Sequence, residues 1–153
     1  MTDAFKQFFD LFNENEKNAP ETEQDVHSFE KKYQIKLPVD YRYFLLTYGD
    51  LWTPDVVNVI DDNHLEIDDV QQFLPIDRIL HDKEFEWTAK LHVDMIPIAS
   101  DCMGNIFGFM TEDLKVSNGE PKIYLFDHDF DTIEPVSNSF KDWIIQFVDI
   151  DKF

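Results

Sequence analysis

The sequence is poor in cysteine, glycine and basic residues, and it has no long apolar run. A single cysteine leaves no internal disulfide, which favours a reducing compartment. Four glycines, none in a Gly-rich loop, exclude the common phosphate-binding loops. No apolar run approaches the roughly 20 residues of a membrane span. The N-terminal MTDAFKQFFDLF has neither the basic region nor the cleavage site of a signal peptide. We therefore expect a cytoplasmic protein.

The charge balance is strongly acidic. The chain has 13 basic and 32 acidic residues, a formal net charge of −19. Such a surface repels phosphate backbones and anionic membranes, so we expect it to bind neither nucleic acid nor a membrane. It attracts a basic protein partner and speeds the encounter at low salt. An acidic surface also serves solubility, and this is the favoured interpretation of the charge alone, because net charge is weak evidence about function.

The first third of the chain predicts helices. The hydrophobic fraction of 43% and the 15 phenylalanines predict one folded domain with an aromatic core. Apolar residues recur at helical spacing in 3–14, and Thr22 with Asp25 resembles a capping box for a second helix. Pro38 suits the start of a third helix, and Gly49 suits its C-terminal cap.

The rest of the chain predicts mainly strands. We expect strands at 56–60, 73–76, 94–99, 105–111 and 122–127, with a helix at about 78–91. Asn118-Gly119 is a hairpin signal, and Ser139 is placed to cap a final helix. This order predicts a single α+β domain with N-terminal helices, a mainly antiparallel sheet and a C-terminal helix.

The segment MIPIASDCMGNIFGFM (95–110) places a polar hinge between two apolar runs. The pair Gly104-Asn105 is typical of a tight turn, and Asp101 suits an Asx-turn. Cys102 would be a nucleophile only with a nearby base and a lowered thiol pKa, whereas acidic neighbours raise that pKa. We interpret the hinge as a structural turn.

The segment Asp127-His128-Asp129-Phe130-Asp131 begins like a calcium-binding loop. The pattern then fails, because the sixth position is Thr132 and the twelfth is Asn138, where glycine and glutamate are required. Turn chemistry at the end of a strand is the favoured interpretation. A metal site built from His64, His128 and nearby carboxylates stays open as an alternative, although no metal-ligand spacing supports it. We expect no cofactor and no metal.

Three segments together resemble the SUKH superfamily. They are FEKKYQIKLPVDYRYFLLTYGD (29–50), MIPIASDCMGNIFGF (95–109) and IYLFDHDFDTIEPVSNSFKDWI (123–144), and they span residues from about 20 to 148 of a single domain, 1–153. The chain departs from the family pattern after the third helix, where Tyr48-Gly49-Asp50 replaces a frequent Asn-Gly pair. The resemblance implies an α+β domain with a bent sheet and no catalytic activity.

The resemblance also implies a protein partner. Many bacterial members are immunity proteins that neutralise a cognate toxin of a polymorphic or contact-dependent system, and others are regulatory interaction modules. An acidic surface suits a basic, nuclease-like toxin. A regulatory module with an endogenous partner is the first alternative, and a metal-dependent hydrolase using His64 and His128 is the second. The candidate partner-binding residues are one tryptophan and ten acids: Asp50, Trp52, Asp61, Asp62, Glu66, Asp68, Asp69, Asp101, Asp127, Asp129 and Asp131.

Overall fold

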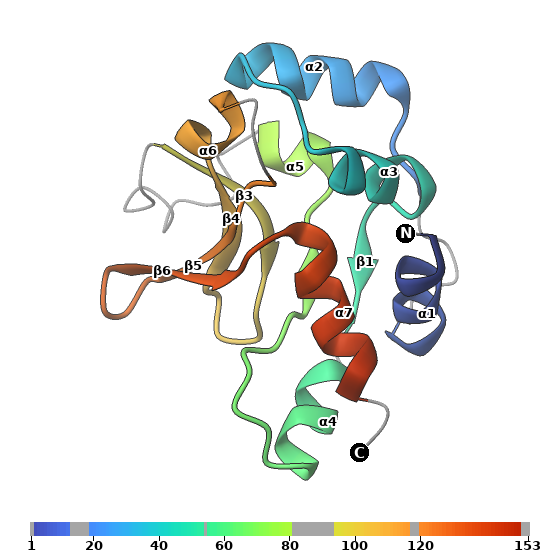
Figure 1. Cartoon of the computed structure of the whole chain (residues 1–153), viewed down its shortest axis with the longest axis vertical. Coiled ribbons are helices and arrows are strands. Elements are labelled where there is room, and N and C mark those ends of the chain that lie inside the picture. The colour runs from blue at the N-terminus through green and yellow to red at the C-terminus, as the bar shows by residue number, and fades with distance from the viewer. Residues whose placement is uncertain (1, 13–18, 54, 81–93, 117–119, 151–153) are drawn as a thin grey trace.

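The structure of the protein is a computed structural model. It describes all residues except 1, 13–18, 54, 81–93, 117–119 and 151–153. An antiparallel sheet lies beside a group of helices, and the C-terminal helix packs between the sheet and the N-terminal helix (Figure 1). This is the expected α+β domain.

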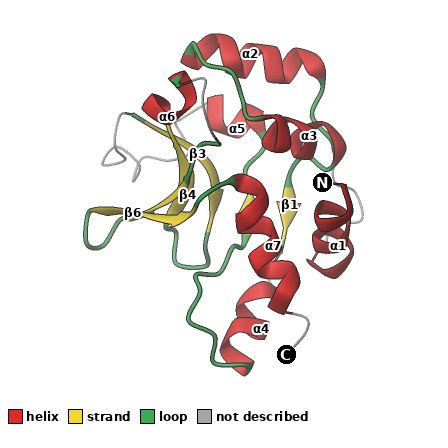
Figure 2. Ribbon diagram, viewed as in Figure 1, coloured by secondary structure: helices red, strands yellow, loops and turns green. Residues whose placement is uncertain are grey.

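Strands and short helices follow an all-helical start, and the described chain ends in a longer helix (Figure 2). The helices are α1 (Thr2–Phe12), α2 (Glu23–Tyr33), α3 (Val39–Thr47), α4 (Asp55–Asp62), α5 (Ile76–Leu80), α6 (Thr111–Lys115) and α7 (Phe140–Ile150). The strands are β1 (Leu51–Trp52), β2 (Gln72–Phe73), β3 (Met95–Ser100), β4 (Ile106–Met110), β5 (Ile123–Asp127) and β6 (Thr132–Ser137).

The predicted capping box of α2 and the glycine after α3 are confirmed. Thr22 Oγ1 accepts a hydrogen bond from Asp25 N at 3.1 Å, and Asp25 Oδ2 accepts one from Thr22 N at 2.8 Å. These two bonds form the capping box that begins α2. After α3, Gly49 has a φ of +70°, and a Cβ there would lie 2.1 Å from the Ala19 carbonyl oxygen. Both the conformation and the space therefore require glycine.

The sheet is a meander in the order β1-β2-β3-β4-β5-β6, and all neighbouring strands are antiparallel. The register breaks between Pro97 and Ala99 and between Ile123 and Tyr124. Such irregularities bend a strand and increase its twist. One row of paired residues crosses five strands on the same face: Leu51, Phe73, Ala99, Phe107 and Leu125.

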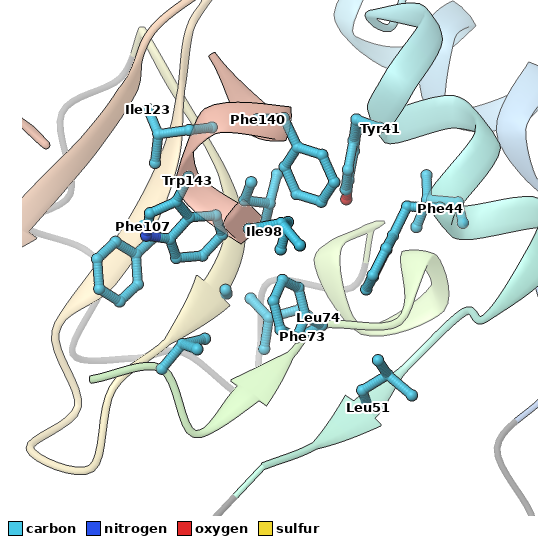
Figure 3. Close-up of a cluster of buried hydrophobic side chains, with 14 of the residues drawn as sticks. Tyr41, Phe44, Leu51, Phe73, Leu74, Ile98, Phe107, Ile123, Phe140 and Trp143 are labelled. Carbon is cyan, nitrogen blue, oxygen red and sulfur yellow. The ribbon is translucent and has the colours of Figure 1, made fainter. Parts of the chain in front are cut away.

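Trp143 of α7 packs on this row. Its ring centroid lies 4.8 Å from that of Phe107 and 5.6 Å from that of Phe73. Phe140, one turn earlier, brings in α3 through Phe44, with ring centroids 5.3 Å apart (Figure 3). The core is thus an aromatic layer between the sheet and the helices, as the phenylalanine content predicts.

The expected strand at 56–60 is wrong, because these residues form α4. Val56 and Ile60 are four residues apart and both are buried, whereas Asn58 is exposed. This spacing places one apolar face of α4 against α7. Packing therefore outweighs the β propensity of the valines.

Several other boundaries differ from the expectation. The strand expected at 73–76 is the shorter β2, and α5 begins at Ile76. Helix α6 and edge strand β6 were not expected; Pro135 weakens the strand signal of β6, which pairs only with β5. The rest of the helix expected at 78–91 and the Asn118-Gly119 turn lie outside the described residues. In the part of the chain that the structure describes, no helix has the length and apolar character of a membrane span.

We expect Phe73→Ala to lower the free energy of unfolding by about 3–5 kcal/mol, because it leaves a cavity in the aromatic layer. Phe130→Ala is the control, because that ring is 79% exposed and its loss should change stability by less than about 0.5 kcal/mol. Urea denaturation followed by tryptophan fluorescence measures both. Equal stability of the two variants would contradict this account of the core.

Candidate protein-binding site at one end of the sheet

Two turns and one loop segment meet at the same end of the sheet. The pairing of Ser100 with Ile106 and of Ile106 with Phe126 places the β3–β4 turn and the β5–β6 turn side by side. The loop before β2 joins them, because Cys102 N donates a hydrogen bond to Asp69 Oδ2 at 2.9 Å. We call this surface the acidic end; its carboxylates are Asp68, Asp69, Asp101, Asp127, Asp129 and Asp131.

Asp101 organises the β3–β4 turn and is only 7% exposed. Its Oδ1 accepts hydrogen bonds from Met103 N at 2.9 Å and from Asn105 N at 2.8 Å. Its Oδ2 accepts a third bond from Asn105 Nδ2 at 2.9 Å. Gly104 has a φ of +85°, which closes the turn. The expectation of an Asx-turn is confirmed, and Asp101 is buried within the turn.

His128 connects the two turns. Its backbone N donates to Asn105 Oδ1 at 3.2 Å, and its ring Nε2 lies 2.9 Å from the Met103 carbonyl oxygen. Its Nδ1 lies 3.4 Å from Asp129 Oδ1. The side chain therefore holds both turns in one fixed arrangement.

Asp127 shapes the β5–β6 turn. Its Oδ1 accepts hydrogen bonds from Asp129 N at 2.9 Å and from Phe130 N at 3.2 Å. Asp131 completes the turn with a φ of +54°. The calcium-like sequence is therefore a strand-end turn, as expected, and it carries Phe130 outwards.

The carboxylates of the acidic end repel one another. Burial, followed by the charges of Asp101 and Asp69, raises the pKa of Asp68. Burial also raises the pKa of Asp101, opposed by its hydrogen bonds from Asn105. Burial and then Asp69 raise the pKa of Cys102 to about 11, so the thiol stays protonated at neutral pH. The hinge lacks the activated thiol that nucleophilic catalysis needs.

The other predicted residues lie around or away from the acidic end. Trp52 is 43% exposed on edge strand β1, in the row that runs through Gln72 to Ser100. Three exposed acids lie at the end of α4 and in the loop after it: Asp61, Asp62 and Glu66. Asp50 lies on the helical side of β1, close to the Glu21 carboxyl, whose pKa is raised by burial and by the charges of Asp25 and Asp50.

Two exposed apolar side chains are not among the residues that the sequence predicted for partner binding. Met103 is 68% exposed at the β3–β4 turn, and Phe130 is 79% exposed at the β5–β6 turn. Both stand among polar residues in a turn, where neither face of the sheet can cover them. An apolar residue within a polar turn was therefore the sequence feature that could have predicted their exposure.

The metal alternative finds no ligand set in the described residues. No group of three or more His, Cys, Asp or Glu side chains there is arranged to hold a metal ion. His64 follows α4 with a φ of +53°, whereas His128 is engaged between the two turns.

Residues 20–146 match the model of the SMI1/KNR4 family, also called SUKH-1. The chain belongs to this family. Its members are commonly immunity proteins and are generally not catalytic. No individual curated protein matches the chain. The family match extends from just before α2 into α7, so it includes the whole sheet and both turns of the acidic end.

We expect Asp68→Asn to raise the melting temperature at pH 7. The pKa of Asp68 is raised above its ordinary 3.8, so the folded state binds more protons than the unfolded chain between those two values. The stability contributed by this group therefore falls as pH rises through that window. The gain from Asp68→Asn should vanish near pH 3.5, below the ordinary carboxyl pKa of about 3.9, and shrink in high salt.

Glu66→Gln is the control for this measurement, because Glu66 is exposed in the same loop. Thermal unfolding followed by circular dichroism at both pH values compares the variants. A gain of the same size in Glu66→Gln would show that the effect reflects net charge alone.

Proposed function

We propose that this chain is an immunity protein that binds and neutralises a cognate basic, nuclease-like toxin of a bacterial polymorphic or contact-dependent system, using the acidic end. Family membership supports a protein partner. The observation that carries the choice of surface is a pair of exposed apolar side chains, Met103 and Phe130, on two neighbouring turns that also carry carboxylates.

The composition of this surface resembles that of a protein interface. Aromatic residues and methionine are enriched at interface cores, and binding energy concentrates on a few such anchors. Phe130 is the prominent anchor, with Met103 on the neighbouring turn and Asp129 beside it. The carboxylates would form the polar rim.

The rigidity of the turns adds to the argument. Asp101, Asn105 and His128 hold the anchors through hydrogen bonds that already exist in the free protein. A preorganised surface loses less conformational entropy on binding. Tight inhibition of a toxin benefits from this saving.

The charge of the acidic end suits a basic target. A nuclease needs a basic surface to hold the phosphate backbone, and an acidic protein can occupy that surface in place of the nucleic acid. Long-range attraction also speeds the encounter, which matters for a protein that must stop a toxin quickly.

We expect Phe130→Ala to weaken toxin binding by at least about 30-fold, the loss of a hot-spot anchor worth about 2 kcal/mol. Val39→Ala is the matched control, because Val39 is 72% exposed at the start of α3. The toxin candidate is first sought among the proteins encoded beside this gene. Surface plasmon resonance against that candidate measures the affinity, and survival of cells co-expressing it measures protection. Unchanged affinity and protection in Phe130→Ala would exclude the acidic end as the binding surface.

We expect the double charge reversal Asp68→Lys with Asp129→Lys to slow association and flatten its salt dependence. Asp131 is left unchanged, because its positive φ disfavours lysine. Glu112→Lys with Glu120→Lys gives the same net charge on exposed sites elsewhere. If both pairs slow association equally, only the overall charge attracts the toxin. Capture of an endogenous regulatory protein in place of a toxin would contradict the immunity role.

A further inference from the structure

A second surface differs from the rest of the molecule in charge. Helix α6 lies near the C-terminal end of α2 (Figure 1). Residues of both helices line an open groove. Its volume is about 680 Å³, within the size range of ligand-binding sites. Its lining is basic and apolar: His27, Glu30, Lys31, Gln34, Ile35, Lys36, Leu114 and Lys115.

The lysines of this groove are not neutralised. Among the described residues, Lys31, Lys36 and Lys115 form no hydrogen bond or ion pair, although the chain has 32 acidic residues. Lys6 and Arg42, in contrast, pair with Asp10 and Glu23. Three neighbouring cations without partners repel one another, so the groove is an isolated positive region on an acidic protein.

The acid in the groove does not offset this charge. Glu30 Oε2 accepts a hydrogen bond from Leu37 N at 2.9 Å, and its Oε1 lies 3.7 Å from the Arg42 guanidinium. Its side chain is only 12% exposed. The carboxylate is therefore occupied within the fold and faces a different cation.

Helix dipoles explain the positions of only two of the three lysines. Lys31 and Lys115 lie in the last turns of α2 and α6, where a positive charge is favourable. Lys36 lies outside any helix, three residues after α2 ends. Its place beside the other two is not accounted for by helix stability.

We propose that this groove binds an acidic peptide segment of a partner protein that also carries apolar side chains. The lysines come from three segments, the last turn of α2, the chain after it and the last turn of α6. Cations on separate segments suit several carboxylates along a peptide better than one phosphate, which needs donors that converge on it. Ile35, which is 7% exposed, and the half-buried Leu114 line the groove, and their exposed atoms would contact apolar side chains between the acids. This site is separate from the acidic end and selects the opposite charge.

The test uses fluorescence anisotropy with a labelled peptide that alternates glutamate and leucine, added to the full chain at low ionic strength. We expect binding that the triple variant Lys31→Glu, Lys36→Glu, Lys115→Glu weakens by at least about tenfold, equivalent to about 1.4 kcal/mol. A peptide alternating glutamate and serine should bind more weakly than the leucine peptide, because it has no apolar contacts.

The control variant Lys6→Glu, Lys122→Glu, Lys141→Glu has the same net charge but reverses lysines outside the groove. Its affinity for the leucine peptide should stay within about twofold of that of the unaltered chain, after correction for ionic strength. Equal weakening by both triple variants would show attraction without a site and overturn the proposal. Absence of binding by the unaltered chain at millimolar peptide would overturn it as well. Neither outcome bears on toxin binding at the acidic end.

Discussion

The packing of Trp143 on the sheet is the contact on which the rest of the structure depends. Its ring lies against Phe107 of β4 and Phe73 of β2, so a single side chain joins α7 to strands far apart in sequence. Phe140 and Phe147 then connect α7 to α3 and α1, through Phe44 and Phe8. Loss of this layer would separate the helices from the sheet, because most of the buried apolar residues belong to one cluster.

The same arrangement leaves one end of the sheet uncovered by the helices. Antiparallel pairing brings the β3–β4 and β5–β6 turns together, and the helical layer does not bury Met103 or Phe130. The carboxylates of the acidic end fall into two groups. Asp101 and Asp127 accept backbone hydrogen bonds that fix the turns, whereas Asp129 and Asp131 remain exposed. A binding surface held by buried or engaged acids can vary its exposed acids without loss of the turns.

Acidic and basic residues gather on different surfaces of the molecule. The acidic end and the basic groove between α2 and α6 lie on different elements, so one small domain presents two surfaces of opposite charge. The net charge of −19 has the same sign as the acidic end, but it gives no indication of the basic groove. Local charge, more than the sum, decides which partner each surface attracts.

The sequence by itself determined the helix caps, the α+β class and the turn chemistry of Asp101 and Asp127, because these depend on residues a few positions apart. It misassigned 56–60, because the burial of Val56 and Ile60 against α7 outweighs local β propensity. The sequence also could not predict which of the acids lie together on one surface. Asp68 and Asp69 join Asp101 only because β2 pairs with β3, and Asp61 and Asp62 stay apart on α4. The placement of Met103 and Phe130 on neighbouring turns, and of Lys36 and Lys115 in the lining of one groove, likewise follows from long-range packing, which no local pattern contains.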